Sequence, residues 1–88
     1  MLLLFDIGNT HTHLGLADDK RVVKHTNIAT AKWFDGGAAA LVKRFVGRNE
    51  PNGAMVCSVV PRATPLARKT VRAAWNLEAT ELTAKTTR

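Results

Sequence analysis

The spacing of apolar residues changes near residue 36, and this change most limits what the chain can fold into. Before it, short apolar segments alternate with turn-forming residues, which is typical of β-strands. After it, Ala38, Leu41, Val42 and Phe45 recur as they would on one face of a helix. The pattern therefore predicts strands first and a helix-containing part second, within the single small domain that 88 residues allow.

Three strands are predicted before the change of spacing. Leu2–Ile7 is a short apolar run that ends at Gly8, as a buried strand entering a turn would. His13–Ala17 can pair back on it, and Arg21–Ile28 follows a polar, turn-like segment. These three segments predict an antiparallel meander.

A helix and a strand are predicted next. Asp35 can cap the start of the helix, and Gly47 is well placed to end it. After a polar loop, Ala54–Val60 is almost continuously apolar, as expected of a strand in the interior of a sheet.

A second helix and a last strand complete the pattern. Thr64 as N-cap with Pro65 in the first turn predicts a helix that runs to about Asn76. Leu77–Thr83 then alternates like a strand. The order β-β-β-α-β-α-β predicts an α/β fold with a mixed sheet, the layout of a ribonuclease-H-like lobe.

The segment between the first two strands is the richest in side chains that could bind a ligand. Its sequence is Asp6-Ile7-Gly8-Asn9-Thr10-His11-Thr12-His13. Gly8 lets the backbone turn tightly and approach a ligand. The backbone amides of this segment, with the side chains of Asn9, Thr10 and Thr12, can donate hydrogen bonds to phosphate oxygens. Asp6 supplies a hard oxygen ligand of the kind that Mg²⁺ prefers. Phosphoryl-transfer sites combine such donors with a metal. The same residues also suit an ordinary hairpin turn, so this segment alone leaves both interpretations open.

Two motifs resemble those of a known family. Asp6-Ile7-Gly8-Asn9-Thr10 resembles the first phosphate motif of the sugar-kinase, actin and heat-shock-protein superfamily. The Asn after the glycine and the early position are similar to the type III pantothenate kinases. Farther along, Ser58-Val59-Val60-Pro61 followed by Thr64-Pro65-Leu66 resembles the second recognisable segment of that family. The resemblance extends from Leu2 to about Thr83.

The resemblance implies ATP-dependent phosphorylation of pantothenate to 4'-phosphopantothenate, the first step of coenzyme A synthesis. It implies Mg²⁺ and a monovalent cation (K⁺ or NH₄⁺) as cofactors, and a cytoplasmic homodimer. It also implies an actin-like bilobal ATPase fold, of which residues 1–88 would be the amino-terminal lobe. On this basis the segment Asp6 to His13 would bind the ATP phosphates, and Asp6 would also serve the metal.

The chain departs from the family pattern because it stops before several motifs. The family's Gly-x-Asp-Arg segment, its second phosphate loop, its cation site and its adenosine pocket do not occur in the 88 residues. We therefore expect no catalytic residue here, a second lobe that is absent from this chain, and no activity of the chain alone. The alternative is a free-standing, non-catalytic nucleotide- or protein-binding module of the same fold.

Composition argues against nucleic acid and membrane partners. The net charge is +6, but no basic run exceeds two residues and none interleaves with aromatic residues. A ribonuclease H would need several converging carboxylates, and Asp6 has no evident companions. The opening apolar run ends at Asp6, too early for a signal peptide or a membrane span. The single cysteine, Cys57, favours a reducing, cytoplasmic setting.

Several other residues are interpreted as structural. Cys57 is expected to be a buried thiol, because it lies among valines in the predicted strand. Ser58 lacks the glycines of a nucleophile elbow and is expected to form the strand exit. His11 and His13 would share a strand face, as polar neighbours of the phosphate segment rather than zinc ligands. His25 is expected on the surface. Packing is the expected role of the aromatic residues Trp33, Phe34 and Trp75.

Overall fold

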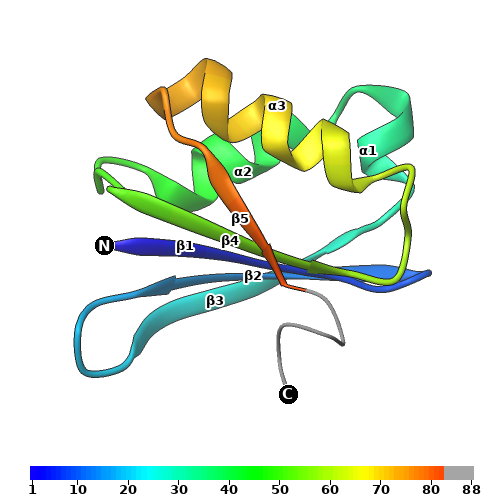
Figure 1. Ribbon diagram of the computed structural model, residues 1–88. Helices are drawn as coiled ribbons and strands as arrows, with labels where there is room; N and C mark the ends of the chain where they lie inside the picture. Colours follow the sequence, from blue (N-terminus) through cyan, green and yellow to red (C-terminus); the bar gives the residue numbers. More distant parts are fainter. Residues whose placement is uncertain (83–88) are drawn as a thin grey trace.

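The structure is a computed structural model that describes residues 1–82 (Figure 1). Its elements are β1 (Leu2–Ile7), β2 (His11–Ala17), β3 (Val22–Ala29), α1 (Lys32–Asp35), α2 (Ala38–Val46), β4 (Gly53–Ser58), α3 (Thr64–Trp75) and β5 (Ala79–Leu82). The strands form one sheet in the order β3-β2-β1-β4-β5. β1, β2 and β3 are antiparallel neighbours, whereas β4 runs parallel to β1 and β5 runs parallel to β4. The predicted α/β class, meander and mixed sheet are confirmed.

The described helices cover one face of this sheet (Figure 1). Alternate side chains of the central strands point toward them and form the core with apolar residues of α2 and α3. The fully buried members with the largest side chains include Leu3, Phe5, Ile7, Leu14, Leu16, Val42, Val46, Val56 and Val71. We call this side the helix face. No helix within residues 1–82 packs on the opposite side, which we call the open face.

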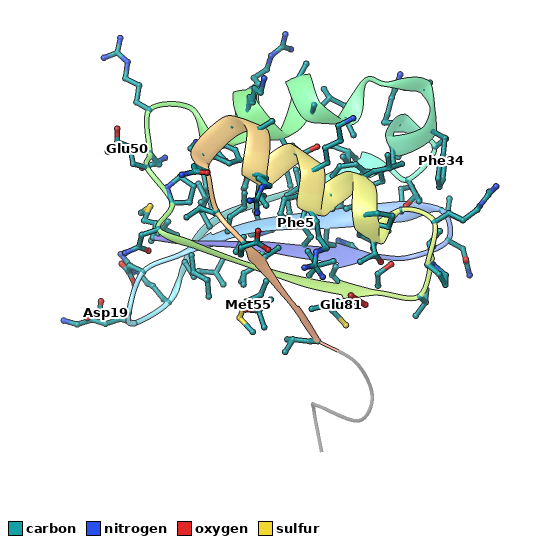
Figure 2. All side chains as sticks on the ribbon, turned by 45° about the horizontal axis from the view of Figure 1, so that its top comes forward. Phe5, Asp19, Phe34, Glu50, Met55 and Glu81 are labelled. Atoms are coloured by element: carbon teal, nitrogen blue, oxygen red, sulfur yellow. The ribbon has the colours of Figure 1, made fainter. Side chains whose placement is uncertain are left out.

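The open face corrects the expectation for Cys57. Its thiol is exposed, not buried. Side chains alternate along β4, so Ala54 and Val56 point into the core while Met55 and Cys57 lie on the open face. The continuous apolar run suggested a strand covered on both faces, but the described helices cover only one. Figure 2 shows Phe5 between the sheet and the helices, whereas Met55 points away from them.

Most element boundaries differ from the predictions by only one or two residues. β2 begins at His11 rather than at His13. β4 ends at Ser58, because the Ser58 hydroxyl donates to the Val60 carbonyl and accepts from its amide, both at 3.0 Å. That local bonding agrees with the expected role of Ser58 at the strand exit. β5 is shorter than predicted, and Thr83 lies outside the described residues.

Neither predicted helix N-cap is confirmed, whereas the predicted end of the first long helix is. The N-cap of α2 is Gly37, with no side-chain cap, although Asp35 Oδ1 accepts from the Gly37 amide at 2.8 Å. Ala63 is the N-cap of α3, so Thr64 is already helical. Gly47 does end α2, and its φ of 62° suits glycine. Among residues 1–82, no helix combines the length and apolar character needed to cross a membrane.

The short helix α1 was not predicted, because four residues are too few to show a helical period. It places Trp33 in the core, where the indole ring lies 5.9 Å from the Phe5 ring, centroid to centroid. Phe34 instead stays 47% exposed, and the Arg62 guanidinium lies over its ring at 5.0 Å. His25 is exposed on β3, as expected.

Candidate phosphate-binding site

The turn between β1 and β2 lies at a topological switch point of the sheet. From β1 the chain passes to β2 on one side, whereas from the neighbouring parallel strand β4 it passes through α3 to β5 on the other. Ligands of open α/β sheets bind where such connections diverge, at the carboxyl ends of the strands. The exposed residues Asn9 and Thr10 lie at this position. Beside them is Val59, 68% exposed, whose amide donates to the Ile7 carbonyl at 3.0 Å.

The turn differs in shape from the usual two-residue hairpin connection. The Gly8 amide donates to the His11 carbonyl at 2.9 Å, so Asn9 and Thr10 are the two connecting residues. Two-residue hairpins favour turns with positive φ at one or both of these positions, but neither residue has a positive φ. A Cβ at Gly8 would lie 3.1 Å from the His11 carbonyl oxygen, a tight contact that glycine avoids.

Asp6 and His13 face each other across β1 and β2 on the open face. The strand register extends this pair into a row across all five strands. The row consists of Asn27, His13, Asp6, Cys57 and Leu82. Its polar members converge on the sheet beside the turn, so the structure brings Asp6 and His13 together as neighbours.

His13 is bonded to Asn27 on the open face. His13 Nδ1 contacts Asn27 Oδ1, and Nδ1 donates to this oxygen in the tautomer that places the proton there. In that tautomer Nε2 is an acceptor, and it becomes a donor when the ring is charged.

Asp6 is an exposed carboxylate with no hydrogen bond or ion pair to another of residues 1–82. No group of three or more His, Cys, Asp or Glu side chains within this range is arranged to hold a metal. Mg²⁺, however, is usually held by one or two carboxylates together with waters and substrate phosphates. Asp6 alone therefore fits a magnesium ion that arrives with a phosphate ligand, and does not fit an ion caged by protein.

A shallow groove of about 510 Å³ lies on the open face next to this row. Its apolar wall includes Leu4, Met55 and Leu82, and its polar end includes Asp6 and His13. The polar end of the groove thus coincides with the carboxyl end of β1, where the turn begins.

The other predicted site residues divide between the two faces. His11 is exposed and shares the open face with His13, as predicted from their spacing. Ile7 is fully buried, and its carbonyl accepts from the Val59 amide, so it offers no surface to a ligand. Thr12 is also fully buried, and its hydroxyl is bonded inside the protein to Thr30 and Trp33.

Two residues next to the turn were not predicted to belong to the site. Thr30 Oγ1 donates to the Gly8 carbonyl at 2.6 Å, and the Thr30 amide donates to the Thr10 carbonyl at 2.9 Å. Trp33 donates from Nε1 to Thr12 Oγ1 at 3.1 Å. No sequence signal indicates these contacts, because they join residues about 20 positions apart.

Comparisons with known proteins identify the family of this chain. A profile of the family described as type III pantothenate kinase matches residues 2–88. The chain belongs to the type III pantothenate kinase family. It is 38% identical over 80 residues to the type III pantothenate kinase of Acidothermus cellulolyticus, a match that covers 85% of this chain and 31% of that protein. It is 34% identical over 82 residues to the Streptomyces avermitilis enzyme, covering 82% of this chain and 31% of that enzyme.

The fold also has a solved counterpart. The Aquifex aeolicus PPX-GPPA enzyme superposes with a TM-score of 0.53 over 92% of this chain and 35% of that one, at 13% sequence identity. At this identity the likeness shows the fold alone. The chain spans about a third of the length of its curated relatives.

Proposed function

We propose that this chain is the ATP-phosphate-binding lobe of an ATP-dependent pantothenate kinase. The observation that carries the proposal is the turn Gly8–Thr10 at the switch point, flanked on the open face by Asp6 and His13. Backbone donors, an exposed carboxylate and an imidazole lie together at this strand end. Membership of the type III pantothenate kinase family supports this assignment.

Each residue has a distinct role in the proposal. The amides and side chains of Asn9 and Thr10 donate to phosphate oxygens. Asp6 holds Mg²⁺, directly or through water, and the ion supplies positive charge to the phosphates. His13, when protonated, donates from Nε2 to a phosphate oxygen on the same face. The buried hydroxyl of Thr12 takes no part in phosphate contact, so Thr12 contributes through the structure of the turn.

The remaining elements of the reaction are also proposals. Pantothenate is the phosphoryl acceptor, and a monovalent cation (K⁺ or NH₄⁺) is a further cofactor, with both sites in a second lobe. The complete enzyme is a cytoplasmic homodimer. Phosphoryl transfer requires both reactants to be held in line, so the 88-residue chain by itself is expected to bind phosphate without turning over pantothenate.

Titration of the 88-residue chain with MgATP, followed by amide NMR signals, tests the proposal. Signals of Asp6, Gly8, Asn9 and Thr10 should move together, and Asp6→Asn should weaken binding about tenfold through loss of a charged contact. Asp19→Asn is the matched control, because Asp19 is exposed in the distant β2–β3 turn.

Two results would count against the proposal. One is no response of the turn at millimolar MgATP. The other is equal weakening by Asp6→Asn and Asp19→Asn, which would reduce Asp6 to a contributor to overall charge.

A further inference from the structure

A buried chain of hydrogen bonds connects the core to the turn Gly8–Thr10. It runs through the side chains of Trp33, Thr12 and Thr30, which are 5%, 0% and 2% exposed. The indole Nε1 of Trp33 lies 3.1 Å from Thr12 Oγ1, which lies 3.0 Å from Thr30 Oγ1. Thr30 Oγ1 in turn lies 2.6 Å from the Gly8 carbonyl oxygen.

The direction of every bond in this chain is fixed by chemistry. An indole N–H can only donate and a carbonyl oxygen can only accept. The Thr30 hydroxyl therefore donates its single proton to the Gly8 carbonyl oxygen. Its oxygen can then only accept a hydrogen bond from the Thr12 hydroxyl. Thr12 then donates to Thr30 and accepts from Trp33. One consistent arrangement satisfies all the side-chain donors, and no buried side-chain polar atom within the described residues lacks a partner.

Thr30 holds two peptide groups of the turn at once. Its hydroxyl donates to the Gly8 carbonyl and its amide donates to the Thr10 carbonyl at 2.9 Å. A trans peptide is planar, with its carbonyl and its following amide on opposite sides, and no peptide of the described chain is cis. Both carbonyls turn toward Thr30, so the amides of Asn9 and His11 must turn away from it.

Amides that turn away from Thr30 can donate hydrogen bonds to the oxygens of a phosphate. Asn9 is exposed, and its amide has no backbone acceptor among residues 1–82. The turn also lacks the positive φ angles that two-residue hairpins favour, so its shape is not the default one. A contact from outside the hairpin is needed to hold it, and Thr30 provides that contact.

We infer that Thr30, supported by Thr12 and Trp33, is a positioning residue that orients the amides of Asn9 and His11, at the turn Gly8–Thr10, to receive phosphate. The inference rests on the proposed function for its ligand, but its structural part does not need one. Donors that are already oriented bind without a cost in ordering the loop.

The first experiment compares hydroxyl removal at two buried threonines. Thr30→Val keeps the side-chain shape and removes the bonds to Gly8 and Thr12. Thr30→Ser keeps the hydroxyl. Thr70→Val is the control, because the Thr70 hydroxyl is also buried but donates to Leu66 within α3.

Amide ¹⁵N relaxation of the ligand-free 88-residue chain is the first measurement. In the wild type, Thr30→Ser and Thr70→Val, the order parameters of Asn9 and Thr10 should stay near the rigid value of about 0.85, and in Thr30→Val they should fall below about 0.6. Unchanged order in Thr30→Val, or equal loss in Thr30→Ser or Thr70→Val, overturns the inference.

MgATP affinity is the second measurement. Thr30→Val should bind about tenfold more weakly than the wild type, with Thr30→Ser and Thr70→Val within about twofold of it. Equal affinity of Thr30→Val and the wild type overturns the inference. If the wild type does not bind MgATP at all, the proposed function fails, and the order parameters alone decide the positioning role.

The wild-type chain offers a test that needs no variant, in case Thr30→Val does not fold. The hydroxyl protons of Thr12 and Thr30 should appear as separate, slowly exchanging signals, because both are bonded and buried. The Trp33 indole N–H should likewise exchange slowly, with the partly buried Trp75 as internal comparison. Rapid exchange of both hydroxyl protons would show that the chain of bonds does not form.

Discussion

The two faces of the sheet are built from the same strands but differ in what they carry. On β1, Leu3, Phe5 and Ile7 point to the helix face and are almost completely buried, whereas Leu2, Leu4 and Asp6 point to the open face and are not. The helix face is apolar apart from four buried threonines, two of which are the bonded pair next to Trp33. The open face places a carboxylate, an imidazole and a thiol in one row.

The helix face therefore provides most of the burial, whereas the open face carries exposed polar side chains. Burial of the helix face stabilises the fold, and two of its threonines form the hydrogen bonds that reach the turn Gly8–Thr10. The open face contributes little to burial among residues 1–82, so its residues remain available to a ligand or another protein surface. The turn Gly8–Thr10 lies at the edge shared by the two faces. Thr30 bonds its carbonyls from the helix face, and Asn9 and Thr10 are exposed to solvent.

The largest expected effect tests which face stabilises the lobe. Phe5→Ala removes a ring packed against Trp33 and should cost about 3–5 kcal/mol of unfolding free energy. That loss is comparable to the whole stability of a domain of this size. Leu4→Ala, at the neighbouring position on the open face, should cost about 1 kcal/mol or less. Urea denaturation followed by far-UV circular dichroism measures both. Similar losses would mean that the open face is covered in solution.

A smaller effect concerns self-association through the open face. Leu4, Met55 and Leu82 form an apolar groove wall of the kind that monomers usually cover. The net charge of +6 opposes association, and salt screens that repulsion. Association measured by sedimentation velocity should therefore increase with ionic strength. Met55→Lys should suppress it, whereas Ala40→Lys, which adds the same charge at an exposed position of α2, should not.

The opposite result would contradict the predicted self-association. A compact monomer that binds no hydrophobic dye at low or moderate salt would show that the open face does not attract another surface. That result would favour a free-standing module over a lobe that requires a partner.

Local patterns were sufficient for the fold because each strand and long helix has its own period. They also indicated Asp6 to His13 as one candidate segment, but only the strand register shows that Asp6 and His13 face each other. They could not show that Cys57 is exposed, because an apolar run does not reveal which face of its strand is covered. They could not reveal Thr30 either. Its bond to Gly8 joins residues 22 positions apart, and only the folded chain brings them together.

The smallest expected effect comes from the turn at the opposite end of β2. Asp18 Oδ1 accepts from the amides of Lys20 and Arg21 at 2.8 and 2.9 Å, and these bonds lower the pKa of Asp18 below its ordinary value of 3.8. The charged carboxylate therefore stabilises the fold above that pH, and the stabilisation is lost as the pH falls through the lowered pKa. Asp18→Asn removes this titration. Urea denaturation at neutral and acidic pH should show a stability difference between wild type and variant that narrows on acidification, because protonation makes the two alike. A difference independent of pH would mean that the turn depends on the shape of residue 18 and not on its charge.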